Sequence, residues 1–175
     1  MSDALSKDNF KDLYNQEAIA KLKELAEDIK TCMFCTELSQ RPFPTRPMVL
    51  QEVDDNGNLW FLSSAKSNKN FEIKEDNEVQ LIFAKNEDIH FLSIYGQATI
   101  YKDKAHIDQV WNTVAKAWFE EGKDDPEITV IKVTPTDAYY WDTKYGKMVS
   151  YVKMIAGMIT GSMKSDGGVE GRLNV

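Results

Sequence analysis

Apolar and polar residues alternate with a period of two through the middle of the chain, which is the pattern of β-strands. Seven segments carry this pattern or a short apolar run: Cys32–Leu38, Pro47–Val53, Leu59–Ser64, Glu78–Ala84, Ile89–Tyr101, Glu127–Val133 and Ala138–Trp141. In the longest segment, Leu92, Ile94, Ala98 and Ile100 share one face, and the other face is more mixed. The alternation predicts a strand that lays one face on a hydrophobic core.

A turn signal joins the second and third strand segments. Asn56-Gly57 lies between their two apolar runs, and this dipeptide in that setting is a strong signal for a β-hairpin. We therefore expect residues 47–53 and 59–64 to be antiparallel neighbours.

Three other segments have helical spacing. Apolar residues recur every three to four positions in residues 15–30 and 103–119, and a shorter helix is expected at 68–76. Asn15 is the predicted N-cap of the first helix, which should cover the core as a lid. The apolar stripe of the 103–119 helix consists of Ile107, Val110, Trp111, Val114 and Trp118.

The segments predict one folded domain with loose ends. We expect a flexible N-terminus at 1–14, a single domain at 15–160, and a flexible Gly- and Ser-rich tail at 161–175. Residues 148–160 are apolar and rich in Met, and predict a last helix or an interaction segment. Strands dominate without β-α-β alternation, so a mainly β fold with flanking helices (α+β), built as a small antiparallel barrel, is predicted.

Composition narrows the classes of partner. The hydrophobic fraction of 42% fits a globular domain, and the net charge of −7 comes without a basic stripe, which argues against a nucleic-acid partner. No apolar run approaches the roughly 20 residues of a membrane helix. The polar, acidic start lacks the layout of a secretory signal, so we expect a cytoplasmic protein with no membrane partner.

Cysteine and histidine do not predict a metal site. Cys32 and Cys35 form a C-x-x-C pair, but they fall in a strand segment, where residues three apart point to opposite faces. A second ligand pair for zinc is missing, so two buried or half-buried thiols are expected. His90 and His106 are isolated, and each is expected to be structural or solvated.

Two polar clusters could bind an anion. Arg46, one of only three arginines, ends the proline-rich run 41–47, and a stiffly held guanidinium is a good phosphate ligand; the alternative is a surface loop residue. Residues 63–70, Ser-Ser-Ala-Lys-Ser-Asn-Lys-Asn, lie between a strand and a helix. Hydroxyls and ammonium groups near free helix N–H groups suit an anion, and the alternative is a Ser N-cap with solvated lysines.

The hairpin brings these clusters into one hypothesis. Arg46 precedes one strand of the hairpin and the Ser/Lys cluster ends the other. Because antiparallel neighbours place those two ends together, Arg46, Ser63, Ser67 and Lys69 are predicted to surround one phosphate.

The same residues carry a family resemblance. Trp60-Phe61-Leu62-Ser63-Ser64-Ala65-Lys66-Ser67-Asn68-Lys69 resembles the flavin-phosphate motif of the pyridoxamine 5′-phosphate oxidase-like split barrels, and Arg46-Pro47-Met48-Val49-Leu50 is similar to their Arg-x-x-x-Leu strand. Tyr95–Thr99, Tyr139–Asp142 and Lys147–Thr160 look like the general stress protein branch of that family.

The resemblance implies a six-stranded antiparallel split β-barrel that binds FMN, with FAD also compatible, at the subunit interface of a homodimer. It implies that Arg46, Ser63, Ser67 and Lys69 hold the phosphate. Met48 and Val49 would face the ring, and Trp141 would be a late aromatic residue lining the flavin site.

The function that follows is a flavin-dependent oxidoreductase of unknown substrate. The alternatives are a non-catalytic flavin carrier or sensor, and an interaction protein that has lost the ligand. Leu62 stands where the vitamin-forming oxidases have tyrosine, Phe91 stands where they have a polar flavin contact, and their C-terminal Arg-x-His motif has no counterpart. These departures argue against pyridoxamine phosphate as the substrate, and no catalytic residue is predicted.

Overall fold

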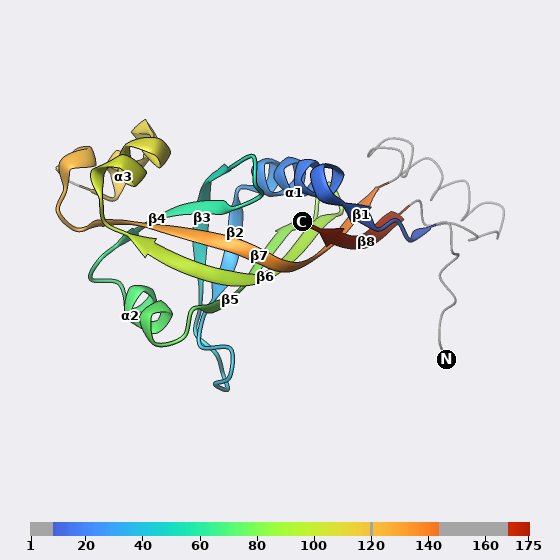
Figure 1. The fold of residues 1–175 in the computed structure, drawn as a ribbon, viewed down its shortest axis with the longest axis horizontal. Helices are drawn as coiled ribbons and strands as arrows, with labels where there is room; N and C mark the ends of the chain where they lie inside the picture. Colours follow the sequence, from blue (N-terminus) through green and yellow to red (C-terminus); the bar gives the residue numbers. More distant parts are fainter. Residues whose placement is uncertain (1–8, 120, 144–167) are drawn as a thin grey trace.

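Six antiparallel strands close into a barrel in the computed structural model, which describes residues 9–119, 121–143 and 168–175 (Figure 1). The barrel strands are β2 (Thr31–Cys35), β3 (Thr45–Val53), β4 (Leu59–Ser64), β5 (Glu78–Lys85), β6 (His90–Tyr101) and β7 (Ile128–Thr143). Their order is β7-β4-β3-β2-β5-β6, and pairing of β6 with β7 closes the ring. The predicted antiparallel split barrel is confirmed.

The β7 strand is longer than the sequence pattern indicates. The segments predicted at 127–133 and 138–141 are parts of one continuous strand, with an irregularity in its pairing opposite Tyr95 and Gly96. A Cβ atom at Gly96 would lie 2.4 Å from the Thr134 carbonyl oxygen. The close approach of the two backbones therefore requires glycine at this position.

Both ends of the chain extend the barrel sheet at β7. Strand β8 (Gly168–Asn174) pairs with β7, and β1 (Leu13–Tyr14) pairs with β8. The predicted flexible tail at 161–175 is therefore wrong for β8, and the N-terminal expectation is wrong for β1. Leu173 explains the difference, because its side chain is buried in the barrel core. The first eight residues and residues 144–167, which include the Met-rich segment, lie outside the described residues.

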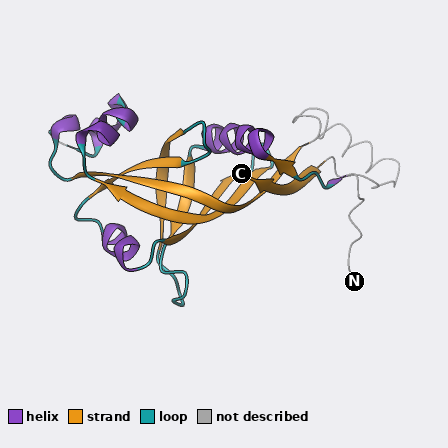
Figure 2. Cartoon of the chain, viewed as in Figure 1, coloured by secondary structure: helices purple, strands orange, loops and turns teal. Residues whose placement is uncertain are grey.

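Helix α1 (Asn15–Ile29) covers one opening of the barrel (Figure 2). Its buried face joins the main hydrophobic core through Ala18, Leu22, Leu25 and Ala26. The predicted lid is thus confirmed. Its N-cap is Tyr14 rather than Asn15, which begins the helix with a φ of 52°.

The helix predicted at 103–119 is wrong in its length. Helix α3 (Lys104–Val110) ends at Val110, because Trp111 adopts an extended conformation. A separate 3-10 turn follows at Thr113–Ala117, where the Asn112 side chain accepts a hydrogen bond from the Ala115 N–H. The predicted single stripe is split as a result, and Trp118 is 62% exposed.

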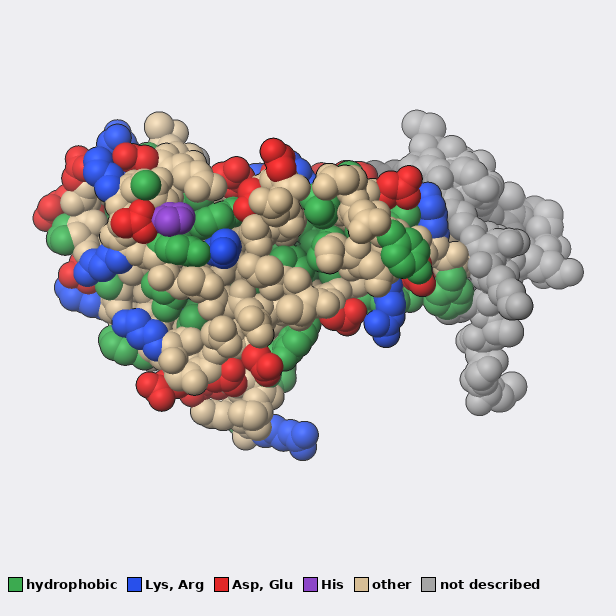
Figure 3. Space-filling model, in the orientation of Figure 1, with side chains coloured by type: hydrophobic (Ala, Val, Ile, Leu, Met, Phe, Trp, Pro, Cys, Tyr) green, Lys and Arg blue, Asp and Glu red, His purple; other side chains and the backbone are tan. Residues whose placement is uncertain are grey.

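Helix α2 (Asn68–Glu75) lies between β4 and β5, as expected. A second small core sits beneath α3 and is formed by Trp60, Ile107, Val110, Phe119, Ile128 and Val130. Charged side chains of both signs are spread over the face seen in Figure 3. None of the described helices has the length and apolar character needed to span a membrane.

Candidate functional site

The β3–β4 hairpin brings the two predicted clusters together. Leu50 pairs with Phe61 and Val53 with Leu59, and Gly57 in the turn has a φ of 81°. The start of β3 and the end of β4 therefore lie at the same end of the hairpin. The antiparallel arrangement inferred from Asn56-Gly57 is confirmed.

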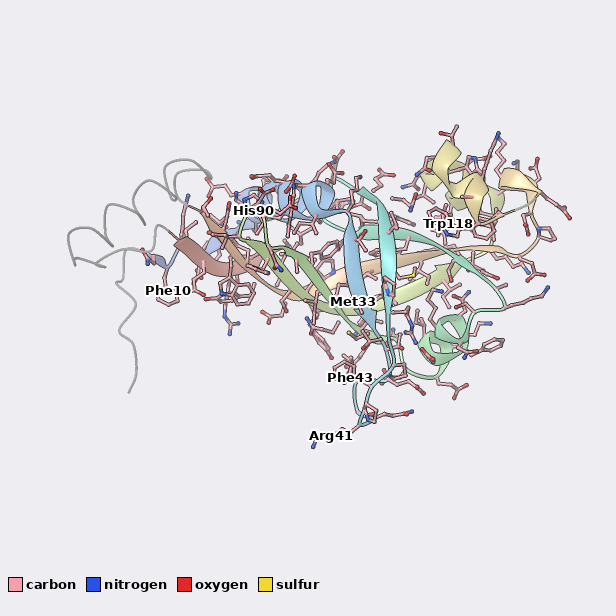
Figure 4. The ribbon with its side chains drawn as sticks, turned by 180° about the vertical axis from the view of Figure 1, so that it is seen from behind. Phe10, Met33, Arg41, Phe43, His90 and Trp118 are labelled. Atoms are coloured by element: carbon pink, nitrogen blue, oxygen red, sulfur yellow. The ribbon has the colours of Figure 1, made fainter. Side chains whose placement is uncertain are left out.

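Arg46 lies at the start of β3 with its guanidinium held on two sides. Its Nη1 donates to Thr36 Oγ1 at 2.6 Å, and its Nη2 donates to Glu72 Oε2 at 2.7 Å in an ion pair. The Thr36 hydroxyl also donates to Glu72 Oε2, at 2.5 Å. Arg46 is thus part of a fixed triad that joins β3 to the α2 helix. Arg41, at the other end of the proline-rich run, is exposed on the loop that precedes β3 (Figure 4).

Lys69 lies in the first turn of α2, next to Arg46. Its ammonium donates to Ser67 Oγ at 2.7 Å. Burial lowers the pKa of Lys69, and the positive charge of Arg46 lowers that pKa further. The structure therefore brings Arg46, Ser67 and Lys69 into one cluster, as the sequence predicted.

Ser63 is buried, and its hydroxyl has a partner inside the protein. It donates to Asn70 Oδ1 at 2.9 Å, while Asn70 Nδ2 donates to Thr129 Oγ1 at 2.7 Å. Thr129 completes the loop by donating to the Ser63 carbonyl oxygen at 3.1 Å. This buried triad ties α2 to β4 and β7. Ser63 therefore supports the cluster by holding α2 in place, and a direct contact of Ser63 with phosphate stays a prediction.

A cavity of about 350 Å³ lies against the outer face of this hairpin. Four of the predicted residues line it, namely Met48, Val49, Ser63 and Lys69. Ala115, Trp118 and Phe119 form another part of its wall, although their spacing in the sequence predicted only that they belong to a helix. One signal in the sequence could have identified this wall. The 103–119 segment holds more large apolar residues than one packed helix face can bury, so some of them had to lie on the surface or line a cavity.

Trp141 does not join this cluster within one chain. Thr129 pairs with Ser63, and Trp141 lies twelve residues further along β7, where it pairs with Phe91. At about 3.3 Å per residue this corresponds to roughly 40 Å of strand. The Trp141 side chain is 40% exposed and lines a separate apolar cavity with Ile82 and Phe91.

A row of apolar side chains, exposed except for the half-buried Phe91, crosses the outer face of the barrel between these two cavities. We call it the apolar strip, and its members are Pro47, Val49, Met33, Ile82, Phe91 and Trp141. Met33 pairs with both Pro47 and Ile82, so the row is continuous from β3 to β5. Met33 and Ile82 are 42% and 45% exposed, and Figure 4 shows Met33 near the middle of the barrel.

A second group of charged residues lies at the α1 end of the barrel, and we call it the α1 charge network. Its members are Lys21, Asp28, Lys85, Asp88, His90 and Asp142. His90 bridges Asp28 and Asp142 at 3.3 and 3.0 Å, and Lys85 lies 2.7 Å from both Asp28 and Asp88. His90 is therefore structural, as predicted. The ligand atoms of Asp28, Asp88 and His90 are close enough to hold an ion, but the Lys85 ammonium already bonds both carboxylates.

The two cysteines are free and buried, as the sequence indicated. Burial raises the pKa of the Cys32 thiol, and the neighbouring Cys35 raises it further. Such a thiol is a poor nucleophile, so the C-x-x-C pair takes no part in the candidate site.

Comparisons with known proteins agree with this geometry. Residues 17–165 match the model of a family described as pyridoxamine 5′-phosphate oxidase like. Protein bli-3 of Neurospora crassa is 26% identical over 126 residues, which cover 67% of this chain and 60% of that protein. The chain thus spans less than two thirds of the length of this curated relative.

Solved structures show the same fold. A protein provisionally called general stress protein 26 from Jannaschia sp. CCS1 superposes with a TM-score of 0.74 at 20% identity, covering 92% of this chain and 100% of that one. The general stress FMN/FAD binding protein of Xanthomonas citri superposes with a TM-score of 0.63 at 26% identity, covering 73% and 90% of the two chains.

Proposed function

The chain belongs to the pyridoxamine 5′-phosphate oxidase-like family, and from this premise we propose that it is a general stress protein that binds a flavin nucleotide, FMN or alternatively FAD. The flavin phosphate binds at Arg46, Ser67 and Lys69. The observation that carries the proposal is that Lys69 lines a cavity and that the positive charge of Arg46 lies close to the Lys69 ammonium. Within the described part of the chain, Lys69 makes no ion pair, so its charge is available to an anion.

The cavity wall suits the isoalloxazine ring. Val49 offers an exposed apolar side chain on β3, Met48 borders the cavity from the barrel core, and Trp118 with Phe119 offers aromatic surface. Ligand pockets are commonly lined by apolar and aromatic side chains with a few polar groups that fix orientation. Gln51 and Ser64 are polar groups of this wall that could orient the ring.

We propose that the active form is a homodimer, with a second copy of the chain covering the apolar strip. Exposed contiguous apolar surface on a soluble domain commonly marks an interface. A twofold interface is built from the same self-complementary patch on both subunits, so that one residue of a subunit contacts a different residue of its partner, and the reverse. Such pairing could place Trp141 of the second copy over the cavity, which would reconcile the predicted role of Trp141 with its distance from Lys69 in one chain.

When bound, the flavin would supply the hydride or electron transfer, and this chain would supply binding and orientation. Among the described residues that line the cavity there is no Asp, Glu or His. That wall favours the second candidate function, a flavin carrier or sensor without turnover. The first candidate, an oxidoreductase of unknown substrate, needs a substrate that exchanges hydride or electrons with the flavin without an acid or base from this wall.

The test of the proposal is gel filtration of the purified protein after incubation with FMN, recorded at the visible absorbance bands of oxidised flavin. We expect flavin to travel with a peak of dimer size. A colourless protein peak would contradict flavin binding, and a coloured monomer would contradict only the dimer. Reduction of the bound flavin by NADH or NADPH, followed by reoxidation by an added acceptor, would then favour the enzyme over the carrier.

A further inference from the structure

The charge of the phosphate cluster is partly cancelled by the protein itself. Glu72, on α2, forms the 2.7 Å ion pair with Arg46, and its side chain is only 15% exposed. Thr36 is fully buried and donates to the same carboxylate oxygen. Glu72 is therefore a fixed counter-ion of Arg46 rather than a mobile surface charge.

Lys69 differs from Arg46 in this respect. It is one helix turn from Glu72 on α2, and the carboxylate raises its pKa less than burial and Arg46 lower it. Its ammonium has a hydroxyl, Ser67, as its partner. The cluster of Arg46, Glu72 and Lys69 thus carries one net positive charge in place of two.

We propose that Glu72 is a specificity-determining residue that sets the charge of the phosphate the cluster accepts. The inference rests on the proposed flavin-phosphate site. A phosphate monoester such as FMN carries close to two negative charges near neutral pH, whereas each phosphate of the FAD diphosphate carries one. Because the Coulomb energy is proportional to each charge, a cluster with one net positive charge favours the dianion over the monoanion much less than a cluster with two.

The substitution Glu72→Gln separates this role from a structural one. Glutamine has the same shape and can still accept a hydrogen bond from Arg46, while Thr36 holds the other side of the guanidinium. Glu75 is the matched control, because it lies on the same helix, is exposed and carries the same charge. Glu75→Gln changes the net charge of the protein equally without touching the triad.

The experiment measures the dissociation constants of FMN, FAD and riboflavin for the full chain and both variants at low ionic strength. We expect Glu72→Gln to tighten FMN about tenfold and FAD about threefold, since the logarithm of the gain should double with the ligand charge. Riboflavin has no phosphate and should change less than about twofold, as should all three ligands with Glu75→Gln. Equal gains for FMN and FAD, or equal effects of the two variants, would overturn the proposal.

The wild-type protein provides a measurement that needs no variant. We expect its preference for FMN over FAD to be no more than about tenfold, because the same cluster should favour the dianion over uncharged riboflavin by about 100-fold and the monoanion by the square root of that factor. A preference for FMN of about thirtyfold or more would contradict the role of Glu72. Failure of the proposed function looks different, since wild-type protein would then bind FMN no more tightly than riboflavin.

Discussion

Two groups of charged side chains lie at opposite ends of the barrel, and they differ in how their charges are balanced. The phosphate cluster combines Arg46 and Lys69 with one carboxylate, Glu72, beside a cavity. The α1 charge network surrounds its two lysines with three aspartates and His90. Trp118 and His90 mark the two ends in Figure 4. Both groups contain ion pairs, so an excess of positive charge next to a cavity is what distinguishes the candidate ligand site from the structural network.

The largest effect is expected from the double substitution Arg46→Ala, Lys69→Ala, which removes both positive charges of the phosphate cluster. We expect the affinity for FMN to fall by about 100-fold or more, since two charge-assisted contacts contribute about 3 kcal/mol together. Riboflavin binding should change little. Flavin fluorescence titration measures both. The matched control is Lys21→Ala, Lys85→Ala, which removes the same charge from the α1 charge network and should leave the FMN affinity within about twofold. An equal loss in both double variants would place the site elsewhere.

The substitution Lys21→Met should have a smaller effect, and that effect should fall on the stability of the fold and not on FMN affinity. Lys21 donates to Asp142 at 2.8 Å, and that carboxylate is 11% exposed. Loss of this partner should cost about 1–2 kcal/mol of unfolding free energy, measured by urea denaturation, while FMN affinity stays the same. Reduced FMN affinity without a loss of stability would show that the network belongs to the ligand site.

A substitution in the cavity wall should change the affinity for flavin by a similar free energy, without changing the stability of the fold. Trp118→Ala should weaken FMN and riboflavin alike, by about tenfold, because the lost aromatic surface faces the ring and not the phosphate. Phe71→Ala is the control, since Phe71 is 56% exposed on α2 and does not line the cavity. A loss confined to FMN would mean that Trp118 acts on the phosphate end.

The pH dependence of binding gives the smallest effect. Burial, with the charge of Arg46 in addition, holds the pKa of Lys69 below its ordinary value of 10.5, so Lys69 loses its proton at a lower pH than an exposed lysine. The FMN affinity relative to riboflavin should therefore decline by about a few fold as pH rises toward 10.5. Lys69→Arg keeps its charge and should flatten the profile. An unchanged ratio across this range in the wild type would exclude Lys69 from the phosphate contact.

Local patterns predicted the parts of the molecule that local chemistry controls. The hairpin followed from Asn56-Gly57, and the cluster of Arg46, Ser67 and Lys69 followed from the two hairpin ends. The barrel itself was predictable because its strands alternate clearly. The break at Val110 was not, since the helical spacing of apolar residues continues past it, and residues on both sides of the break pack into the same small core.

Residues distant in sequence account for what the patterns missed. In the sequence, Glu72 is indistinguishable from the other charged residues of its helix. Only the fold places it against Arg46, which is 26 positions away. Strand β8 has a Gly-rich start that suggested a loose tail, yet Gly171 is needed where a Cβ atom would lie 2.1 Å from the Lys11 carbonyl oxygen. Such packing constraints depend on the partner segment and leave no local signal.

We propose above that the phosphate of a flavin nucleotide binds beside Lys69 and Arg46. The most direct test compares the dissociation constants of FMN and riboflavin for the wild-type protein, because these ligands share the ring and differ in the phosphate. We predict that FMN binds about 100-fold more tightly than riboflavin. Equal affinities, or no binding of either ligand, would contradict the account.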